Sequence, residues 1–462
     1  MRRAYRRTLG ACVGLGFLGG VPAAGASGPT PQDDENQALR ERVKSLEQTV
    51  SLLQRQQEAR EEAEAGKSAQ PILGAGPDGF FIQSADKKSY KIRLRGYVQA
   101  QGRFFAGGDL VVQESNEFLM RRVRPIVEGT VAEFVDFKIM PDFGLGTTVL
   151  QDAYLNAHYW PFAQLQTGKF KEPFGIERLQ SGSSLTFIER GVPNTIVPNR
   201  DVGAQLWGTW REGLVTYQLA AFDGTNDGGS TDGDNNDGKD FVGRVFVQPF
   251  QETTWTPLAG FGIGLAGSSG EANGTPAGYK TVGQQTFFKY GSNVQQSGNR
   301  WRISPQLYWS WGPFGLLGEW VQSSTELRNK SPKKGGPAPD LRADNTAWQL
   351  QASYVLTGES ASYYGVVPRT SFVPAKGTWG AFELAARYGE LAVDKDIFRE
   401  GFASISKSAD HERSYGVDFN WYLNRFLKWQ LEFDQTFFDG GATEGNDRPT
   451  ESVIMTQFQV SY

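Results

Sequence analysis

The twelve residues from Glu451 to Tyr462 alternate between two kinds of side chain. One set is mainly apolar, ends in an aromatic residue, and comprises Ile454, Thr456, Phe458, Val460 and Tyr462. The other set is polar and comprises Gln457, Gln459 and Ser461. Because successive side chains of a strand point to opposite faces, this segment suits a sheet with lipid on one face and water on the other. The pattern predicts a strand of a transmembrane β-barrel.

The composition favours a barrel over a bundle of membrane helices. The mean hydropathy is −0.44, and beyond the N-terminus no run of ~20 apolar residues could form a spanning helix. The 56 glycines, 13% aromatic residues and short alternating runs separated by Gly, Asp, Asn and Pro indicate an all-β chain. The formal net charge is −4 and no basic tail dominates, so nucleic acid is not an expected partner.

The first residues have the form of an export signal. Four arginines precede a small apolar run from Leu9 to Val21, and Ala24-Gly25-Ala26 follows as a cleavage motif. We therefore expect residues 1–26 to be a signal peptide. Its removal would discard Cys12 and leave a mature chain without thiol chemistry.

A heptad pattern follows the signal. Leu39, Val43, Leu46, Val50 and Leu53 recur at spacings of four and three, with charged and amide residues between them. The spacing predicts a short periplasmic coiled-coil helix over 39–65. The alternative is a single amphipathic helix lying on its own barrel. Residues 66–79 are expected to form a linker, and 80–462 the barrel domain.

About sixteen antiparallel strands can be placed in that domain. They are expected near 91–104, 118–127, 131–140, 151–160, 164–170, 201–211, 214–222, 241–249, 258–267, 300–311, 316–324, 346–356, 378–389, 414–422, 427–438 and 451–462. Connections alternate between tight and long, as periplasmic turns and outer loops do, which places both termini in the periplasm. The connection from Thr357 to Gly377 does not fit, because it is too long for a periplasmic turn.

Strand parity assigns a set of arginines to the lumen, because an arginine facing lipid at mid-bilayer would cost ~2–4 kcal/mol. The expected pore-lining and anion-binding set is Arg93, Arg95, Arg103, Arg122, Arg124, Arg244, Arg302 and Arg387. The same parity also turns acids inward, namely Asp136, Asp152, Glu383, Glu432 and Asp434. Two interpretations therefore stay open: a channel that prefers anions, and a general pore with opposed charges.

Catalytic and metal-binding patterns are sparse. The only histidines are His158 and His411, so we expect no metal centre, no cofactor and no enzyme activity. Asp232, Asp234 and Asn236 have calcium-ligand spacing, but Asp237 and Gly243 occupy the positions that an EF-type loop fills with glycine and an acid. The loop from Asp223 to Asp240 is better interpreted as a flexible outer segment that divalent ions bridge weakly to anionic lipid head groups.

Several motifs resemble one family in the right order. They are Phe118-Leu119-Met120-Arg121-Arg122-Val123-Arg124, Gln166-Thr167-Gly168-Lys169-Phe170-Lys171-Glu172-Pro173-Phe174-Gly175, Asn199-Arg200-Asp201-Val202-Gly203 and Trp379-Gly380-Ala381-Phe382-Glu383-Leu384. Over roughly 91–462 the chain resembles the phosphate-selective porin O and P family of Gram-negative outer membranes.

The resemblance implies a homotrimer of sixteen-stranded barrels, each with its own pore, in which the third outer loop folds inward as a constriction. That loop corresponds to Lys171 through Arg200. Constriction contacts are then expected from Lys169, Lys171, Arg178, Arg190 and Arg200.

The expected function is passive diffusion of small hydrophilic solutes through the cell outer membrane, with small anions such as phosphate favoured. Outer-membrane lipid and lipopolysaccharide would surround the barrel. The alternative is a structural protein that tethers the envelope through its N-terminal helix.

Overall fold

The computed structural model describes residues 31–68, 70–76, 79–106, 115–233, 237–330 and 340–462. The predicted signal peptide and part of the predicted divalent-ion loop, including Asp234 and Asn236, lie outside the described residues. The chain divides into two compact units, Met1–Gln70 and Pro71–Tyr462.

The first unit contains one helix, α1 (Pro31–Ser68), which is longer than the predicted 39–65. Its interior is rich in Glu, Gln, Arg, Leu and Ala, which favour helix. All its side chains described, those of 35–61, are exposed, including the apolar seam from Leu39 to Leu53. Among the described residues, no helix is long and apolar enough to cross a bilayer.

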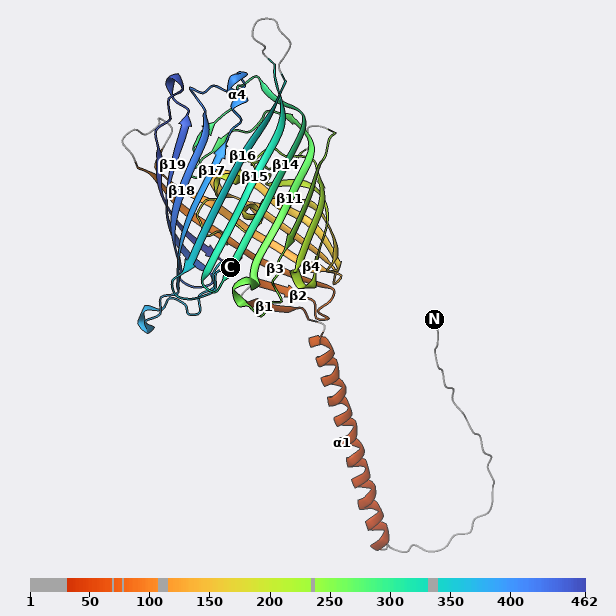
Figure 1. The fold of residues 1–462 in the computed structure, drawn as a ribbon. Coiled ribbons are helices and arrows are strands. Elements are labelled where there is room, and N and C mark those ends of the chain that lie inside the picture. Colours follow the sequence, from red (N-terminus) through yellow and green to blue (C-terminus); the bar gives the residue numbers. More distant parts are fainter. Residues whose placement is uncertain (1–30, 69, 77–78, 107–114, 234–236, 331–339) are drawn as a thin grey trace. The chain divides into compact units, whose positions relative to one another are not determined.

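The second unit is a closed antiparallel barrel, which confirms the predicted sixteen strands (Figure 1). The first eight are β3 (Tyr90–Phe105), β4 (Glu117–Val131), β5 (Val135–Asp142), β6 (Val149–Trp160), β7 (Ala163–Lys171), β8 (Arg200–Trp210), β9 (Val215–Phe222) and β10 (Asp240–Val247). The remaining eight are β11 (Gly260–Gly274), β14 (Val294–Trp311), β15 (Phe314–Asn329), β16 (Asp340–Val355), β17 (Ala381–Ala392), β18 (Ala409–Tyr422), β19 (Leu427–Gly440) and β20 (Glu451–Ser461).

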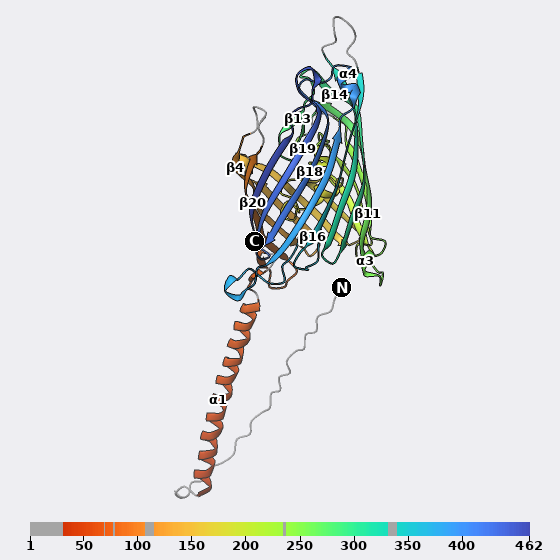
Figure 2. The same ribbon diagram turned by 60° about the vertical axis from the view of Figure 1, so that its left-hand side comes forward.

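Closure occurs along β3, which has different partners on its two halves. β20 pairs with β3 from Tyr97 to Phe105, and Figure 2 brings β19 and β20 forward. β2 (Gly79–Gln83) pairs with the preceding part of β3, from Lys91 to Leu94. β2 also forms a hairpin with β1 (Ile72–Gly76), so the segment 66–79, which was expected to be a linker, contains a strand.

The two ends of the barrel differ in their connections. At the short-turn end, β6 and β7 are joined by 161–162, and β14 and β15 by 312–313. At the long-loop end, β7 and β8 are joined by 172–199, and β11 and β14 by 275–293, which carries β12 (Tyr279–Lys280) and β13 (Thr286–Phe288). The 356–380 connection between β16 and β17 is an exception, because it lies at the short-turn end but is long.

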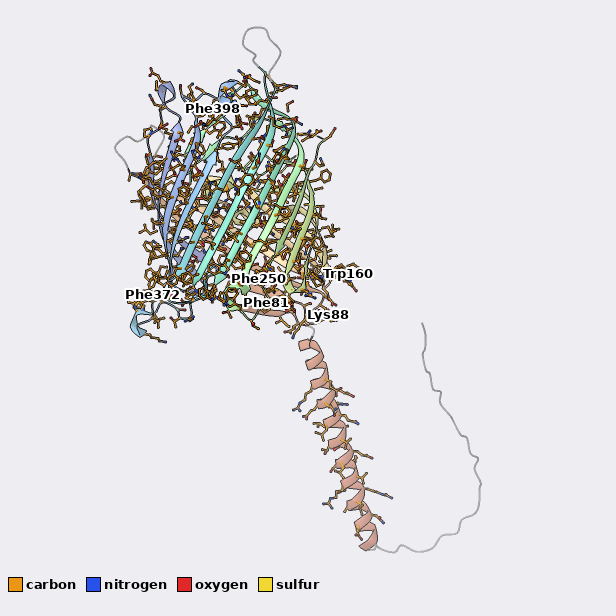
Figure 3. The ribbon with its side chains drawn as sticks, in the orientation of Figure 1. Phe81, Lys88, Trp160, Phe250, Phe372 and Phe398 are labelled. Carbon is orange, nitrogen blue, oxygen red and sulfur yellow. The ribbon has the colours of Figure 1, made fainter. Side chains whose placement is uncertain are left out.

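Side chains sort by parity as a membrane barrel requires. On β20, Glu451, Val453, Met455, Gln457 and Gln459 are buried in the interior, whereas Ile454, Phe458 and Val460 are exposed on the outer face. Exposed aromatic residues also gather at the short-turn rim, where Figure 3 shows Trp160 and Phe250. Phe372 lies at the same end, and Phe398, which packs partly buried against the interior, lies at the opposite end (Figure 3). Exposed aromatic residues at a rim are typical of barrels that meet a membrane interface.

An apolar cluster fills part of the interior at the long-loop end. The 172–199 loop, which we call the inner loop, contributes Phe174, Val192, Ile196 and Val197. The 275–293 loop contributes Tyr279, Phe287 and Phe288, and strand residues such as Val321, Ala347 and Leu391 complete the cluster. We call this cluster the apolar plug. Its wall residues lie on β9 to β19, and Phe170 of β7 belongs to it as well.

Candidate functional site

The inner loop crosses the barrel because polar side chains of the wall bind its backbone. Glu319 accepts a hydrogen bond from Ile176 N at 3.0 Å, and Glu432 accepts one from Ile188 N at 2.5 Å. Wall side chains also donate to the loop carbonyls of Gly182 (from Gln99), Ser183 (from Gln459), Leu185 (from Lys428), Thr186 (from Gln430 and Asn420) and Glu189 (from Arg387). These anchors hold the loop from several strands at once.

The acids of the inner loop strengthen this attachment. The Glu177 carboxylate accepts from Gly191 N at 3.0 Å and from Gln349 Nε2 at 2.8 Å, which ties two parts of the loop to β16. Gly191 permits the close approach, because an added Cβ would lie 1.7 Å from Gln349 Oε1. Glu189 binds Arg121 through both carboxylate oxygens. The loop is therefore held in one position by charged and polar contacts along its length.

A basic cavity lies between this loop and the wall at the long-loop end. Its volume is about 230 Å³. It is lined by six arginines and a single acid, namely Arg121, Arg122, Arg124, Arg178, Arg190, Arg200 and Asp142. We call it the outer cavity.

Four of the six arginines have a carboxylate partner and two do not. Arg124 pairs with Asp142 at 2.7 Å and Arg200 with Asp152 at 2.7 Å, while Arg121 and Arg122 share Glu189. Arg178 instead donates to Asn194 O, and Arg190 donates to Glu177 O at 3.2 Å and Gln180 O at 2.7 Å. Among the described residues, no salt bridge neutralises either side chain. Backbone carbonyls orient these two guanidiniums. Glu177 is close enough to attract both charges without forming a salt bridge to either.

Both guanidiniums remain charged at neutral pH despite their burial. Burial lowers the pKa of Arg178 to about 10, and the nearby charge of Arg200 adds to the effect. Burial lowers the pKa of Arg190 to about 9, to which the charge of Arg178 contributes. Burial also opposes ionisation of Glu189, but Arg121 and its neighbours outweigh it and hold the pKa of Glu189 at about 2. The cavity thus has a permanent excess of positive charge.

A second, larger cavity of about 820 Å³ lies at the short-turn end, and we call it the vestibule. Arg93 and Arg95 line it, each paired with Glu128 at 2.8 Å. Lys171 also lines it and donates to Gln180 O at 2.8 Å. Arg124 and Arg200 line both the vestibule and the outer cavity. The two cavities therefore adjoin at these arginines, and we call them together the passage.

The structure brings eight of the thirteen predicted site residues onto this passage. Those on the outer cavity or the vestibule are Arg93, Arg95, Arg122, Arg124, Lys171, Arg178, Arg190 and Arg200. The other five are buried within the barrel but line neither cavity, and they are Arg103, Lys169, Arg244, Arg302 and Arg387.

These five have local partners. Arg302 binds Asp227 at 2.8 Å and Arg387 binds Glu432 at 2.9 Å, both among fully buried groups. Arg103 binds Glu117 and Glu189, Lys169 binds Asp232, and Arg244 donates to Gln306 and Gln218.

Strand parity missed Arg121. The register between β3 and β4 shifts by one residue here, since Gln99 pairs with Arg122 and Ala100 pairs with Met120. Arg121 is the extra residue of a β-bulge, and a bulge redirects a side chain that strict alternation would place outside. Its guanidinium consequently reaches Glu189 on the inner loop. The run Arg121-Arg122-Val123-Arg124 was the only sequence signal for it.

The histidines occupy ordinary polar contacts. His158 Nδ1 lies 2.9 Å from Asp136, and His411 Nδ1 lies 3.1 Å from Asp439. Within the described part of the chain, no three His, Cys, Asp or Glu side chains gather as a possible metal site.

Barrels of similar fold occur among solved structures. The outer membrane channel DcaP of Acinetobacter baumannii is similar in fold, with a TM-score of 0.52 and 11% identity over 81% of this chain and 98% of that chain. An anion-selective porin from Comamonas acidovorans has a TM-score of 0.50 and 10% identity over 81% of this chain and all (100%) of that one. The comparison with curated proteins finds no match.

A sequence family model places the chain more specifically. The model for phosphate-selective porin O and P matches residues 92–462. The chain therefore belongs to this family and is an outer-membrane porin.

Proposed function

We propose that this porin favours small anions, with phosphate as the first candidate. The proposal depends on one observation: Arg178 and Arg190 form no salt bridge among the described residues, and they lie in a cavity lined by six arginines and one acid. A guanidinium presents parallel N–H donors that match the oxygens of a phosphate. The family description and the anion selectivity named for the Comamonas porin support the same solute class.

Passage would occur by diffusion between several weak sites and would need no energy source. An anion from the long-loop end would first exchange water for the guanidiniums of the outer cavity. Arg124 and Arg200 would then carry the contact into the vestibule, since they line both cavities. Conduction needs sites that attract an ion yet release it, and shared arginines with carboxylate partners provide such weakened binding. No step of this sequence is catalytic.

The acids along the passage argue against the alternative of a general pore with opposed charges. Asp142, Asp152 and Glu128 are each bound by at least one cation of the wall. The charges of these acids are therefore largely neutralised by direct ion pairs, whereas Arg178 and Arg190 have no such pair among the described residues and are attracted only at longer range by Glu177.

Reversal potentials in planar bilayers test the proposal. In a KCl gradient the reversal potential of the purified protein should have the sign of a channel that prefers chloride to potassium. Phosphate should compete with chloride for passage. A potential of the cation-favouring sign would overturn the anion preference. If chloride and phosphate permeate equally and neither blocks the other, the protein is a general anion porin and is not specific for phosphate.

We further propose that the porin is a homotrimer whose α1 helices associate in the periplasm, with the barrels surrounded by outer-membrane lipid and lipopolysaccharide. The exposed seam from Leu39 to Leu53 supports this, because a short heptad helix is marginal alone but stable once other contacts gather the chains. The competing role is attachment of the envelope. Deletion of 31–68 separates the two: loss of trimers in native electrophoresis indicates assembly, whereas intact trimers with a detached envelope indicate a tether.

A further inference from the structure

The vestibule carries more positive charge than its acids can neutralise. Only two acidic side chains line it, Glu128 and Asp152. The cationic side chains that line it are Arg93, Arg95, Arg124, Lys138, Lys171, Arg200, Arg425 and Lys428. Its volume of about 820 Å³ lies within the range of ~300–1,000 Å³ that small-molecule sites occupy. The vestibule therefore has room for an anion larger than phosphate itself.

Three of these cations gather around one acid. Arg93 and Arg95 each bind Glu128 at 2.8 Å, and Lys138 is the cross-strand neighbour of Glu128. Lys138 also binds Asp152 at 2.8 Å. The side chains of Arg93 and Arg95 are 37% and 41% exposed, so each guanidinium keeps further N–H groups for a solute.

A row of amide side chains lies on the wall beside these cations. In the register of the sheet, Asn156 of β6 pairs with Gln166 of β7, which pairs with Gln205 of β8. All three are more than nine-tenths buried, and Gln166 and Gln205 line the vestibule. Lys138 lies two residues along β5 from Asp136, the partner of Asn156 in the same register. The row thus begins near a cation and runs away from it across the sheet.

Gln166 and Gln205, which we call the amide pair, keep unused hydrogen-bonding groups. Gln205 Nε2 donates to Gln166 Oε1 at 3.1 Å. Gln205 Oε1 accepts no hydrogen bond, and Gln166 Nε2 donates none within the described part of the chain. A buried polar atom without a partner costs free energy that a ligand can recover. A hydroxyl group fits such a pair, because it can donate to an amide oxygen and accept from an amide nitrogen.

We propose that the vestibule binds small organic phosphates that carry hydroxyl groups, namely phosphate monoesters of short polyols. The phosphate group would contact Lys138 and Arg93, which flank Glu128 in the register of the sheet. The hydroxyls would bind the amide pair. The inference rests on the anion preference proposed above and names the class of solute: charged at one end and hydroxylated at the other.

Two esters of the same charge and chain length test the proposal. Glycerol 3-phosphate carries two hydroxyls that n-propyl phosphate lacks. Each ester is added while chloride carries the current through the purified protein in planar bilayers. The half-blocking concentration of glycerol 3-phosphate should be about fivefold lower than that of n-propyl phosphate, the factor expected from one net hydrogen bond. Equal half-blocking concentrations would overturn the proposal.

Gln166→Leu with Gln205→Leu tests the amide pair itself. The two replacements remove its hydrogen-bonding groups and keep side chains of similar size. We expect the two esters to block this variant alike. Gln351→Leu is the matched control, because Gln351 is also a buried, inward amide but lines neither cavity. A difference between the esters that survives in the double variant would overturn the assignment to the amide pair. Gln205→Leu alone provides the same comparison if the double variant does not fold.

Inorganic phosphate, recorded on the same channels, keeps this proposal apart from the anion preference. If inorganic phosphate blocks the chloride current but the two esters block alike, the hydroxyl site is wrong and the anion preference stands. If the reversal potential has the cation-favouring sign, the anion preference fails. A stronger block of that current by glycerol 3-phosphate than by n-propyl phosphate would still support the hydroxyl site.

Discussion

The barrel interior contains two regions made from the same inner loop. On one side, Phe174, Ile196 and Val197 join the apolar plug. On the other side, Arg178 and Arg190 face the outer cavity. One loop therefore takes part in both regions: its apolar side packs in the plug, and its basic side lines the outer cavity beside β4, β6 and β8. The difference implies that stability and selectivity depend on separate residues and can be changed independently.

Charge reversal on the basic side should give the largest effect. Arg178→Glu with Arg190→Glu replaces by acids the two cations that form no salt bridge among the described residues. We expect the chloride-to-potassium permeability ratio to fall by more than about tenfold, because like charge in a confined passage repels the permeant ion. The reversal potential measures it. Arg328→Glu with Arg342→Glu makes the same change of charge among exposed ion pairs outside both cavities, and should alter the ratio far less.

A cavity in the plug should act on stability and leave selectivity unchanged. Phe288→Ala removes a fully buried ring from the apolar plug and should destabilise the barrel by about 3–5 kcal/mol. The temperature of the heat-induced mobility shift in electrophoresis measures this loss. Phe118→Ala, at an 83% exposed position, is the control. A changed reversal potential in Phe288→Ala would contradict the separation of the two regions.

Arg302 tests whether an inward arginine must belong to the passage. Its guanidinium binds Asp227 at 2.8 Å, and Arg300 binds Asp240 close by. Arg302→Met leaves buried acids without their partner and should cost about 3–5 kcal/mol. Adding Asp227→Asn should restore part of that stability. The chloride-to-potassium permeability ratio should stay the same in both variants. A clear drop would show that Arg302 belongs to the conducting path.

The smallest effect is expected from Glu172 and concerns pH. Its carboxylate is fully buried without a hydrogen-bond partner, and burial raises its pKa from 4.5 to about 8. The folded barrel keeps this proton at neutral pH, so the resulting stability is complete below about pH 4.5 and is lost as the pH rises through about 8.

Glu172→Gln should remove that dependence, because the amide stays neutral. At about 1.4 kcal/mol per pKa unit, the variant's gain in free energy of unfolding above pH 8 is on the order of 1–3 kcal/mol after relaxation of the site. Thermal unfolding of both proteins at pH 5 and pH 9 gives the comparison. Parallel curves for the two proteins would show that Glu172 does not control this stability.

Much of the fold could be predicted from the sequence because the bilayer imposes a two-residue period. That period located all sixteen strands and placed Arg302, Arg244 and Arg387 among inward residues. It could not show what the interior contains. Contacts such as Glu432 with Ile188 join residues far apart in the chain, and no local pattern reveals them. The sequence therefore could not distinguish inward arginines that line the passage, such as Arg124, from those held in buried ion pairs, such as Arg302.

Two further misses have local causes. Arg121 escaped because a β-bulge breaks the alternation on which the prediction depended. The 356–380 connection was noticed only as too long for a turn. Its inward path depends on tertiary contacts of Tyr363 with the inner loop, which composition does not indicate.

β3 pairs with β2 along its first part and with β20 along the rest, and this pairing affects association between molecules. An unpaired strand margin offers N–H and C=O groups to any foreign strand and so invites edge-to-edge aggregation. β20 and the following Tyr462 cover β3 only from Gly96 onward, and without β2 the preceding stretch would stay open. The N-terminal hairpin thus protects a place that barrel closure alone leaves vulnerable. Deleting the hairpin ahead of Tyr90 would expose this strand edge and promote aggregation between copies of the chain.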